Sequence, residues 1–292
     1  MKEFSQSSDR AYWYPVLLGN LEQELSIFFR TKGFYHISMP LINHSVAKKN
    51  INFHLQIDKN DFELSSSNAL RLGYASTIYG KVFCLSSVFR NEKTLSKNHL
   101  REFRVIEAEW PEEDFNNLIS FVEEMFLFGI DVYNRFIREN SLTAIFSLKT
   151  IDKIRKVVFS DIIPNDKMNG KPISMRQNEH YVPIVKEPTM IMFYPPQMSW
   201  RAKRIDKEKS LIFNLILPDD YGELVEFSLR ETNPDIIANK FRAANILEEY
   251  QWYVDGLRHN SSVSVGLGMG IERFVNWLVE GKSVSDMRLF NL

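Results

Sequence analysis

Residues 80–110, GKVFCLSSVFRNEKTLSKNHLREFRVIEAEW, constrain the fold of this chain more than any other segment. Between Val82 and Phe89 most residues are apolar or β-prone, and a second such run begins at Phe103. Residues 91–100, which separate the two runs, are polar and basic and too many for a tight hairpin turn. The segment therefore predicts two strands joined by a long polar loop.

Charged side chains stand within these two apolar runs, at Arg90, Glu102, Arg104, Glu107 and Glu109. Burying a charge without a partner is unfavourable. Either the charges pair across the hairpin, or this face of the sheet is hydrated and binds a ligand. The residue pattern by itself leaves both interpretations open.

The order of residues in this segment resembles the second signature motif of the class II aminoacyl-tRNA synthetases, most closely in the asparaginyl/aspartyl branch. The matching elements are Phe89-Arg90-x-Glu92, His99-Leu100-x-Glu102-Phe103 and Glu107-x-Glu109. The resemblance implies that Arg90 grips the α-phosphate of ATP and that Phe103 stacks on adenine. It also places Glu92 and His99 around the β- and γ-phosphates and the reacting end of ATP. A planar guanidinium matches a phosphate, and an aromatic face suits a purine.

Residues 264–281, SVGLGMGIERFVNWLVEG, resemble the third class II motif, a glycine-rich strand followed by Glu-Arg on a helix. The glycine spacing differs from G-x-G-x-x-G and lies near the C-terminal end, which excludes a dinucleotide fingerprint. Arg273 is expected in the first helical turn, where backbone N–H groups favour anions. The resemblance implies that Arg273 holds the γ-phosphate and covers adenine, with Gly268 and Gly270 in the ATP site. A structural salt bridge is the alternative for Arg273.

Residues 210–230, SLIFNLILPDDYGELVEFSLR, predict two strands around a turn at residues 219–220. They resemble the family segment that supplies ligands of the catalytic Mg²⁺ and an arginine for the substrate side chain. The resemblance makes Glu223 a metal ligand and ATP-binding residue, Ser228 a nearby hydroxyl ligand, and Arg230 the substrate arginine. An exposed hairpin is the alternative for Glu223 and Glu226.

The chain departs from the family pattern where the amino acid would bind. Asn214 stands where the family has an aspartate, and Glu226 and Phe227 replace two glycines, which implies a reshaped pocket. In residues 63–73, ELSSSNALRLG, the family has a glutamine-rich sequence that reads the amino acid, and Ser66 and Asn68 are the residues expected to meet the substrate here. A serine-rich helix cap is the alternative.

A second departure concerns the loop that closes on the substrate's α-amino group in this family, which carries an acidic residue. Residues 44–57, HSVAKKNINFHLQI, contain Lys48 and Lys49 and no acidic residue. The departure questions whether the usual α-amino group is recognised, and a solvated loop is the alternative.

Arg201, Lys203 and Arg204, farther along, are expected to form a solvated edge.

Helical periodicity predicts scaffold helices over residues 14–31 and 114–137, the second capped by Asp114, and a further helix that starts at Asn233-Pro234. A strand over residues 34–42 contains Pro40, which is typical of a sheet edge. The first helix and this strand together resemble the first class II motif, which forms a dimer interface. A homodimer is therefore expected.

Composition is ordinary for a globular protein, with 292 residues, of which 44% are hydrophobic and 25% charged. We expect one catalytic domain over residues 1–292 with a small helical insertion at about residues 141–188. The single cysteine, Cys84, excludes an internal disulfide and any multi-cysteine metal site. No apolar run is long enough for a bilayer, and the N-terminus lacks a signal-peptide core, so the expected location is cytoplasmic and not in a membrane.

The resemblance implies an α+β fold, with an antiparallel sheet flanked by helices, and an ATP-dependent ligase that uses Mg²⁺. Such an enzyme activates a small carboxylic or amino acid as an acyl-adenylate. The first predicted helix leaves no room before it for an anticodon-reading barrel, and the net charge of −1 gives no basic footprint for nucleic acid. The expected acceptor is therefore ammonia or a small amine, as in stand-alone paralogues related to asparagine synthetase, and tRNA is not expected.

Two alternatives to this function remain. The first is aminoacylation of tRNA through contacts with its acceptor end alone, with Lys93, Lys97 and Arg101 as the nearby basic residues. The second is a non-catalytic paralogue that binds ATP or an amino acid. The presence of Arg90, Phe103, Glu223 and Arg273 disfavours this last alternative.

Overall fold

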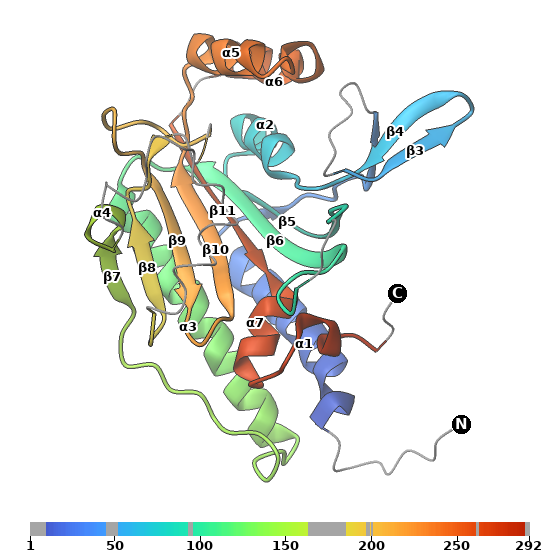
Figure 1. Ribbon diagram of the computed structural model, residues 1–292, viewed down its shortest axis with the longest axis vertical. Helices are drawn as coiled ribbons and strands as arrows, with labels where there is room; N and C mark the ends of the chain where they lie inside the picture. Colours follow the sequence, from blue (N-terminus) through green and yellow to red (C-terminus); the bar gives the residue numbers. More distant parts are fainter. Residues whose placement is uncertain are drawn as a thin grey trace.

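An eight-stranded β-sheet forms the centre of the computed structural model, which describes residues 10–44, 52–92, 96–162, 185–196, 199, 201–260 and 263–289 (Figure 1). Its strands, in spatial order, are β1 (Tyr35–His36), β5 (Val82–Phe89), β6 (Glu102–Pro111), β11 (Ser264–Gly270), β10 (Gly222–Leu229), β9 (Ile212–Leu217), β8 (Thr189–Met192) and β7 (Arg155–Val158). The strands pair antiparallel except at the two edges, where β1–β5 and β7–β8 are parallel. The predicted α+β fold is confirmed, whereas the sheet is mixed rather than wholly antiparallel.

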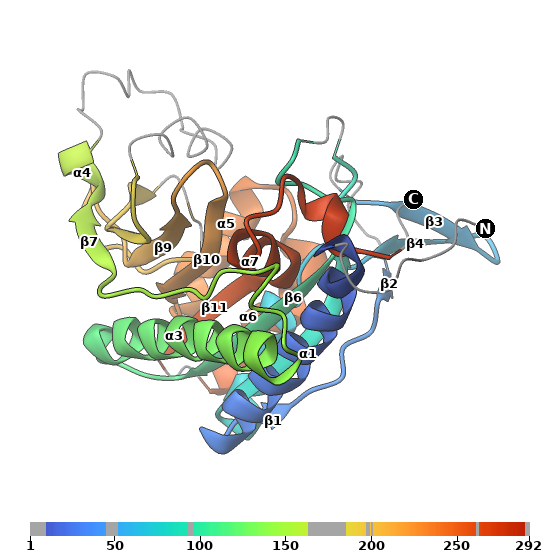
Figure 2. The same ribbon diagram turned by 90° about the horizontal axis from the view of Figure 1, so that it is seen from below.

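Three helices cover one face of this sheet: α1 (Arg10–Thr31), α3 (Phe115–Glu139) and α7 (Ile271–Leu278). Figure 2 shows α1 and α3 side by side against the sheet. The main core lies in this layer, and Leu21, Val122 and Phe126 are fully buried in it. The contact between α3 and α7 is so close that a Cβ on Gly129 would lie 2.3 Å from Cε1 of Phe274, so this position requires glycine.

The predicted helix boundaries are close to those observed. Helix α1 extends the expected span by one turn at its start, and Gly33, at φ 83°, ends it. Asp114 caps α3 by accepting a hydrogen bond from the Asn116 N–H at 2.8 Å. Asn233 caps α5 (Pro234–Ala243) by accepting bonds from two backbone N–H groups. Local capping chemistry therefore decided where these helices begin.

The opposite face of the sheet is covered at one end by α2 (Ala69–Tyr79), with α5 and α6 (Leu247–His259) beyond it (Figure 1). Leu72 of α2 packs with Val82 and Cys84 of β5. A separate apolar cluster joins α5 to α6. These helices leave the middle of this face of the sheet uncovered, between β6, β11 and β10.

A second, three-stranded sheet projects from the body: β2 (Ile42–His44), β4 (Asn60–Leu64) and β3 (His54–Ile57) (Figure 1). Residues 44–57 are therefore not only a loop, because β3 pairs with β4 around a turn at residues 58–59. Lys48 and Lys49 lie outside the described residues. The single strand expected at residues 34–42 is split into β1 and β2, since Pro40 between them has no N–H to donate to a ladder.

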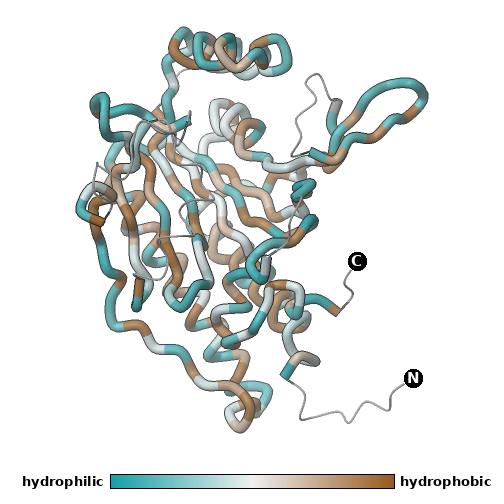
Figure 3. The backbone as a smooth tube through the Cα atoms, viewed as in Figure 1, coloured by the Kyte–Doolittle hydropathy of each residue, from teal (hydrophilic) through white to brown (hydrophobic). Residues whose placement is uncertain are grey.

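The described part of the expected insertion contains strand β7 as well as one short helix, α4 (Phe159–Ile162), while residues 163–184 lie outside the described residues. Because β7 extends the main sheet, this part is not purely helical. After α7, the 3₁₀ helix η4 (Val284–Met287) is the last regular element. None of the helices in the described ranges has the length and apolar character needed to cross a bilayer. Hydrophobic residues follow the strands, and hydrophilic ones occupy many of the connections (Figure 3).

Candidate active site

A cavity of about 550 Å³ lies on the uncovered face of the sheet. Most of the residues predicted as site residues line it: Ser66, Arg90, Glu92, His99, Phe103, Glu223, Arg230, Gly268, Gly270 and Arg273. Asn68 and Ser228 are not among the lining residues and are fully buried. Segments far apart in the sequence are thus brought together as the resemblance implied.

Strand β11 forms the floor of the cavity with alternate glycines. A Cβ on Gly266 would lie 1.9 Å from Oε2 of Glu109 and 2.2 Å from Nη2 of Arg230, so these two side chains lie directly on the backbone. At Gly268 the nearest atom to such a Cβ is 3.7 Å away. Side chains therefore cover the floor at Gly266, whereas the floor is open at Gly268.

We name the two ends of the cavity by their arginines. The Arg273 end consists of Arg90, Glu92, His99, Phe103, Glu223 and Arg273. The Arg230 end consists of Ser66, Ser67, Glu107, Arg201 and Arg230. Glu226 lies between them on β10.

At the Arg273 end, two guanidinium groups lie beside the carboxylate of Glu223, on which both act electrostatically. Arg273, in the first turn of α7, donates to the backbone carbonyl oxygens of Glu223 and Asn98, the latter at 2.9 Å. The guanidinium carbon of Arg90 lies 5.2 Å from the ring centroid of Phe103. This end therefore gathers two cations that line the cavity, where a phosphate group could meet them.

Glu223 lies beside these cations, in a strand that is central in the sheet, so the alternative of an exposed hairpin is wrong. Burial, together with the neighbouring Glu226, raises the pKa of Glu223 to about 7, against the opposing effect of Arg273 and Arg90. The amide nitrogen of Asn214 donates to the Glu223 carboxylate.

The oxygens next to Glu223 fit a hard cation. Oδ1 of Asn214 is buried and has no hydrogen-bond partner among the described residues. A carboxylate and an amide oxygen are ligands that Mg²⁺ accepts. Ser228 does not fit that role, because its hydroxyl is buried and accepts a bond from Nη1 of Arg230 at 2.6 Å. Asn214 is also buried, at 1% exposed, and turns its amide nitrogen toward Glu223, so its oxygen would face a shared cation only after the amide rotates.

At the Arg230 end, an ion pair is fully buried. Arg230 is 5% exposed and donates from Nε to Oε1 of Glu109 at 3.0 Å and from Nη2 to Oε2 at 3.1 Å. Since Nη1 donates to Ser228, every nitrogen of this guanidinium has a protein partner. Arg230 therefore orders the floor of the cavity, and the sequence did not show that Glu109 neutralises it.

A second guanidinium, that of Arg201, lies at the same end, and the expectation that Arg201 is solvated is wrong. Its Nη2 donates to the carbonyl oxygen of Ala69 at 3.1 Å and lies 3.7 Å from Oε2 of Glu109. Burial lowers the pKa of Arg201. No residue pattern around Arg201 distinguished it from the basic residues that follow it.

The start of α2 is attached to Glu107. The carboxylate accepts hydrogen bonds from Oγ of Ser67 at 2.6 Å and from the backbone N–H of Asn68 at 2.8 Å. The Asn68 side chain points away from the cavity and donates to Oγ of Ser86 at 2.9 Å. Ser66 thus lines the cavity, and its contact with the substrate stays a prediction, whereas Asn68 supports the cavity from behind. The charge at position 107, within an otherwise apolar run, was the signal for this contact.

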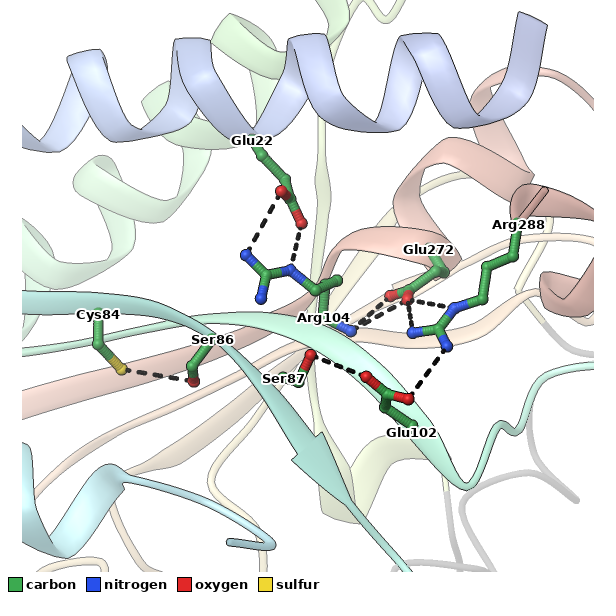
Figure 4. Close-up of polar contacts among 8 residues, drawn as sticks. All are labelled: Glu22, Cys84, Ser86, Ser87, Glu102, Arg104, Glu272 and Arg288. Carbon is green, nitrogen blue, oxygen red and sulfur yellow. Dashed lines mark hydrogen bonds and ion pairs between the residues drawn. The ribbon is translucent and has the colours of Figure 1, made fainter. Parts of the chain in front are cut away.

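The remaining charges of residues 80–110 pair with distant elements rather than only across the hairpin (Figure 4). Arg104 donates from Nε to Glu22 of α1 at 2.6 Å, and its backbone N–H donates to the carboxylate of Glu272. Arg288 donates to the same carboxylate at 2.7 Å and lies 3.8 Å from Glu102. Burial raises the pKa of Glu272, and Arg288 opposes this. The network fixes the start of α7, where Arg273 stands.

Comparison with known proteins identifies relatives of this arrangement. Residues 19–292 match the family model described as tRNA synthetases class II (D, K and N). The asparagine–tRNA ligase of Lactobacillus gasseri is 27% identical over 272 residues, which are 86% of this chain and 62% of that protein. The cytoplasmic asparagine–tRNA ligase of Mus musculus is 24% identical over 90% of this chain and 50% of its own length. The chain thus spans 62% and 50% of the length of these two relatives.

Solved structures share the fold. The asparaginyl-tRNA synthetase of Pyrococcus horikoshii, in complex with asparaginyl-adenylate, superposes with a TM-score of 0.84 at 23% identity, over 96% of this chain and 68% of that one. The enzyme of Entamoeba histolytica, also with asparaginyl-adenylate, gives 0.83 at 22% identity, over 97% and 67%. The predicted class II synthetase-like fold is confirmed.

These relatives contradict two expectations drawn from the sequence: that the acceptor is ammonia or an amine other than tRNA, and that tRNA is not a partner. Both curated relatives are named tRNA ligases. The expectations rested on the net charge of −1 and on the place where the first helix begins. Net charge describes the whole surface and does not exclude a local contact with nucleic acid. The match covers most of the chain and includes its cavity, and this chain belongs to the family of class II tRNA synthetases (D, K and N).

Proposed function

We propose that this chain activates an amino acid with ATP as an aminoacyl-adenylate and transfers the aminoacyl group to tRNA. The observation that carries the proposal is the convergence of Arg90, Phe103, Glu223 and Arg273 on one cavity. It is supported by the shared fold with synthetases solved in complex with asparaginyl-adenylate. Asparagine is accordingly the first amino acid to test.

In this proposal the Arg273 end binds ATP. Arg90 faces the α-phosphate, Arg273 the γ-phosphate, and Phe103 the adenine ring. Their charges are pre-positioned, since Arg273 is already held by two carbonyl oxygens, so little reorganisation is needed when negative charge develops at the α-phosphate. Glu92 and His99 line the same end, next to the triphosphate.

Mg²⁺ is proposed at Glu223, with the amide oxygen of Asn214 as a second ligand once the amide has rotated toward it. When bound, the ion would neutralise phosphate charge while the carboxylate of the amino acid attacks. The support is the buried, unpaired Oδ1 of Asn214 beside a carboxylate. Among the described residues no group of three or more His, Cys, Asp or Glu side chains forms a metal site, so the phosphates of ATP would supply the remaining ligands.

The basic residues near the cavity mouth are proposed to meet the acceptor end of tRNA. Lys97, half-exposed, lies 2.8 Å from Asp220, and Arg101 is exposed. Lys93 lies outside the described residues.

The test is aminoacylation of total tRNA with ATP, Mg²⁺ and labelled asparagine. Acid-precipitable label that RNase removes is the expected result, and the Arg273→Ala variant serves as the inactive control. Asparagine-dependent pyrophosphate exchange without RNase-sensitive label would contradict the tRNA step while retaining adenylation. Absence of both with every amino acid would contradict the proposed function.

We propose that the active form is a homodimer. Each chain would form one catalytic domain over residues 1–292 and would act in the cytoplasm. Large apolar side chains are exposed on α1 and near β1 and β2: Tyr12, Val16, Ile27, Tyr35, Leu41 and Ile42. Burial of such a surface favours association. Light scattering at micromolar concentration should give twice the chain mass, and a monomer would contradict the dimer.

A further inference from the structure

Glu226 differs from the other carboxylates around the cavity. It is half-buried on β10 and lines the cavity, with Asn214 of β9 and Gly268 of β11 as its neighbours across the strands. The amide nitrogen of Asn214 is engaged by Glu223, and Gly268 has no side chain. Glu226 makes no hydrogen bond or ion pair with any residue that the structure describes.

The neighbouring carboxylates all have protein partners. Glu107 accepts two hydrogen bonds from uncharged groups at the start of α2. Glu109 is paired with Arg230, and Glu223 accepts a bond from Asn214. A half-buried carboxylate without such a partner is electrostatically unfavourable. A ligand that offers a cationic donor would relieve this at Glu226.

The charges around Glu226 are largely engaged with one another. Arg71 acts electrostatically on Glu107, while Arg201 and Arg230 act on Glu109. Both arginines lie against Glu109, at 3.7 Å and 3.0 Å. The carboxylate of Glu226 would therefore attract an ammonium group of a ligand placed beside it and repel a second carboxylate at the same place.

The position of Glu226 selects which part of the ligand it meets. It interacts electrostatically with Glu223 on one side and with Arg201 and Arg230 on the other. Under the proposed function, the reacting carboxylate lies at the Arg273 end, close to the α-phosphate. The substituent on the adjacent carbon atom then lies at the junction of the two ends, beside Glu226.

We propose that Glu226 is a specificity-determining residue that binds the cationic amino group next to the reacting carboxylate, so that the substrate is an α-amino acid without an anionic side chain. This inference rests on the proposed adenylate chemistry. Glu226 forms a charge-assisted hydrogen bond to the ammonium, and its own negative charge disfavours an anionic side chain beside it, as in aspartate.

The test compares two non-hydrolysable adenylate analogues that differ only in the amino group. One is the sulfamoyl adenosine that carries asparagine, and the other carries succinamic acid, which lacks the α-amino group. Titration calorimetry on the full chain should show that the wild type binds the asparagine analogue at least about tenfold more tightly. In Glu226→Gln, which keeps the size and removes the charge, this ratio should fall about tenfold.

The control is Glu248→Gln, which removes the same charge from an exposed position on α6 and should leave the ratio unchanged. Equal affinity of the wild type for both analogues would overturn the proposal without help from any variant. An equal loss for both analogues in a folded Glu226→Gln protein would also overturn it, because Glu226 would then act through shape. If neither analogue nor ATP binds the wild type, the proposed function is wrong, and this inference, which depends on it, is wrong as well.

Discussion

The two ends of the cavity hold their arginines in opposite ways. Arg273 is bound to two neutral carbonyl oxygens and lies in the first turn of a helix, whereas Arg230 is buried and fully paired with Glu109 and Ser228. A guanidinium in a buried bidentate pair with a carboxylate mainly holds the protein together. The contacts described for Arg273 are to backbone carbonyl oxygens, which fix its position without such a pair.

The largest expected effect is a loss of folding stability when Arg230 is removed from the floor of the cavity. Arg230→Ala leaves the carboxylate of Glu109, which is 1% exposed, without its bidentate partner. Removing one member of a buried pair lowers the free energy of unfolding by about 3–5 kcal/mol. Urea unfolding measures this.

A paired replacement sharpens this prediction. If the loss comes from the stranded charge, Arg230→Met combined with Glu109→Gln should recover part of the stability, since the amide removes the charge and keeps an oxygen for Arg201 and Ser264. If the double variant is as unstable as Arg230→Ala, the comparison between the two ends loses its physical basis.

The second effect concerns the Arg273 end. Arg273→Ala should weaken ATP affinity about 100-fold, because a charge-assisted contact to phosphate is lost. Its free energy of unfolding should change less than that of Arg230→Ala, since water can hydrogen-bond the two carbonyl oxygens that it leaves. Calorimetric titration with ATP and a urea melt of the same sample measure both quantities.

Arg101→Ala is the matched control, because Arg101 is an exposed arginine near the same cavity. It should retain the ATP affinity of the wild type. A Arg273→Ala protein that is as unstable as Arg230→Ala would show that the two ends are held in the same manner.

The third effect is a dependence of stability on pH. The pKa of Glu223 is raised to about 7 in the folded chain, chiefly by burial, above the ordinary value of 4.5. Its contribution to stability is therefore fully present below pH 4.5 and is lost as the pH rises through 7. Without ATP or Mg²⁺, the wild type should lose on the order of 2 kcal/mol relative to Glu223→Gln between pH 5 and pH 8. Urea melts at both pH values measure it, and a constant difference would contradict the shift.

The Arg273 end was more predictable from sequence than the Arg230 end. Arg90, Phe103 and Arg273 stand within contiguous motifs whose spacing fixes them on a hairpin and on a helix start, and all three line the cavity. The positions of strands and helices could be predicted for the same reason, because periodicity and helix capping are local properties of the sequence.

The contacts of the Arg230 end depend on pairing between strands that are distant in sequence. The Arg230–Glu109 pair joins residues 121 positions apart, and Arg201 reaches the cavity from a segment without a distinctive pattern. Asn68 and Ser228 were placed in the site by resemblance, yet both are buried behind it. Local pattern does not encode which face of a packed element a polar side chain meets. The expectation of an acceptor other than tRNA failed for a related reason. It was based on the net charge of the whole chain, which does not show how charges are distributed on the surface.

The smallest effect tests whether the Arg273 end depends on a frame behind it. Arg288 donates to Glu272, the residue before Arg273, and the carboxylate of Glu272 also receives the backbone N–H of Arg104 (Figure 4). Arg288→Ala should lower ATP affinity by about fivefold to tenfold, roughly 1 kcal/mol, since the side chain of Arg288 is 22% exposed and water can partly replace it.

Lys97→Ala provides the contrast, because it removes an ion pair whose members are 48% and 56% exposed and that does not contact Glu272. That variant should change ATP affinity by less than about twofold. The two variants are measured by titration with ATP at one ionic strength. A Arg288→Ala protein with unaltered ATP affinity would mean that Arg273 is positioned by its carbonyl contacts alone, and the Arg273 end would then be independent of the ion-pair network behind it.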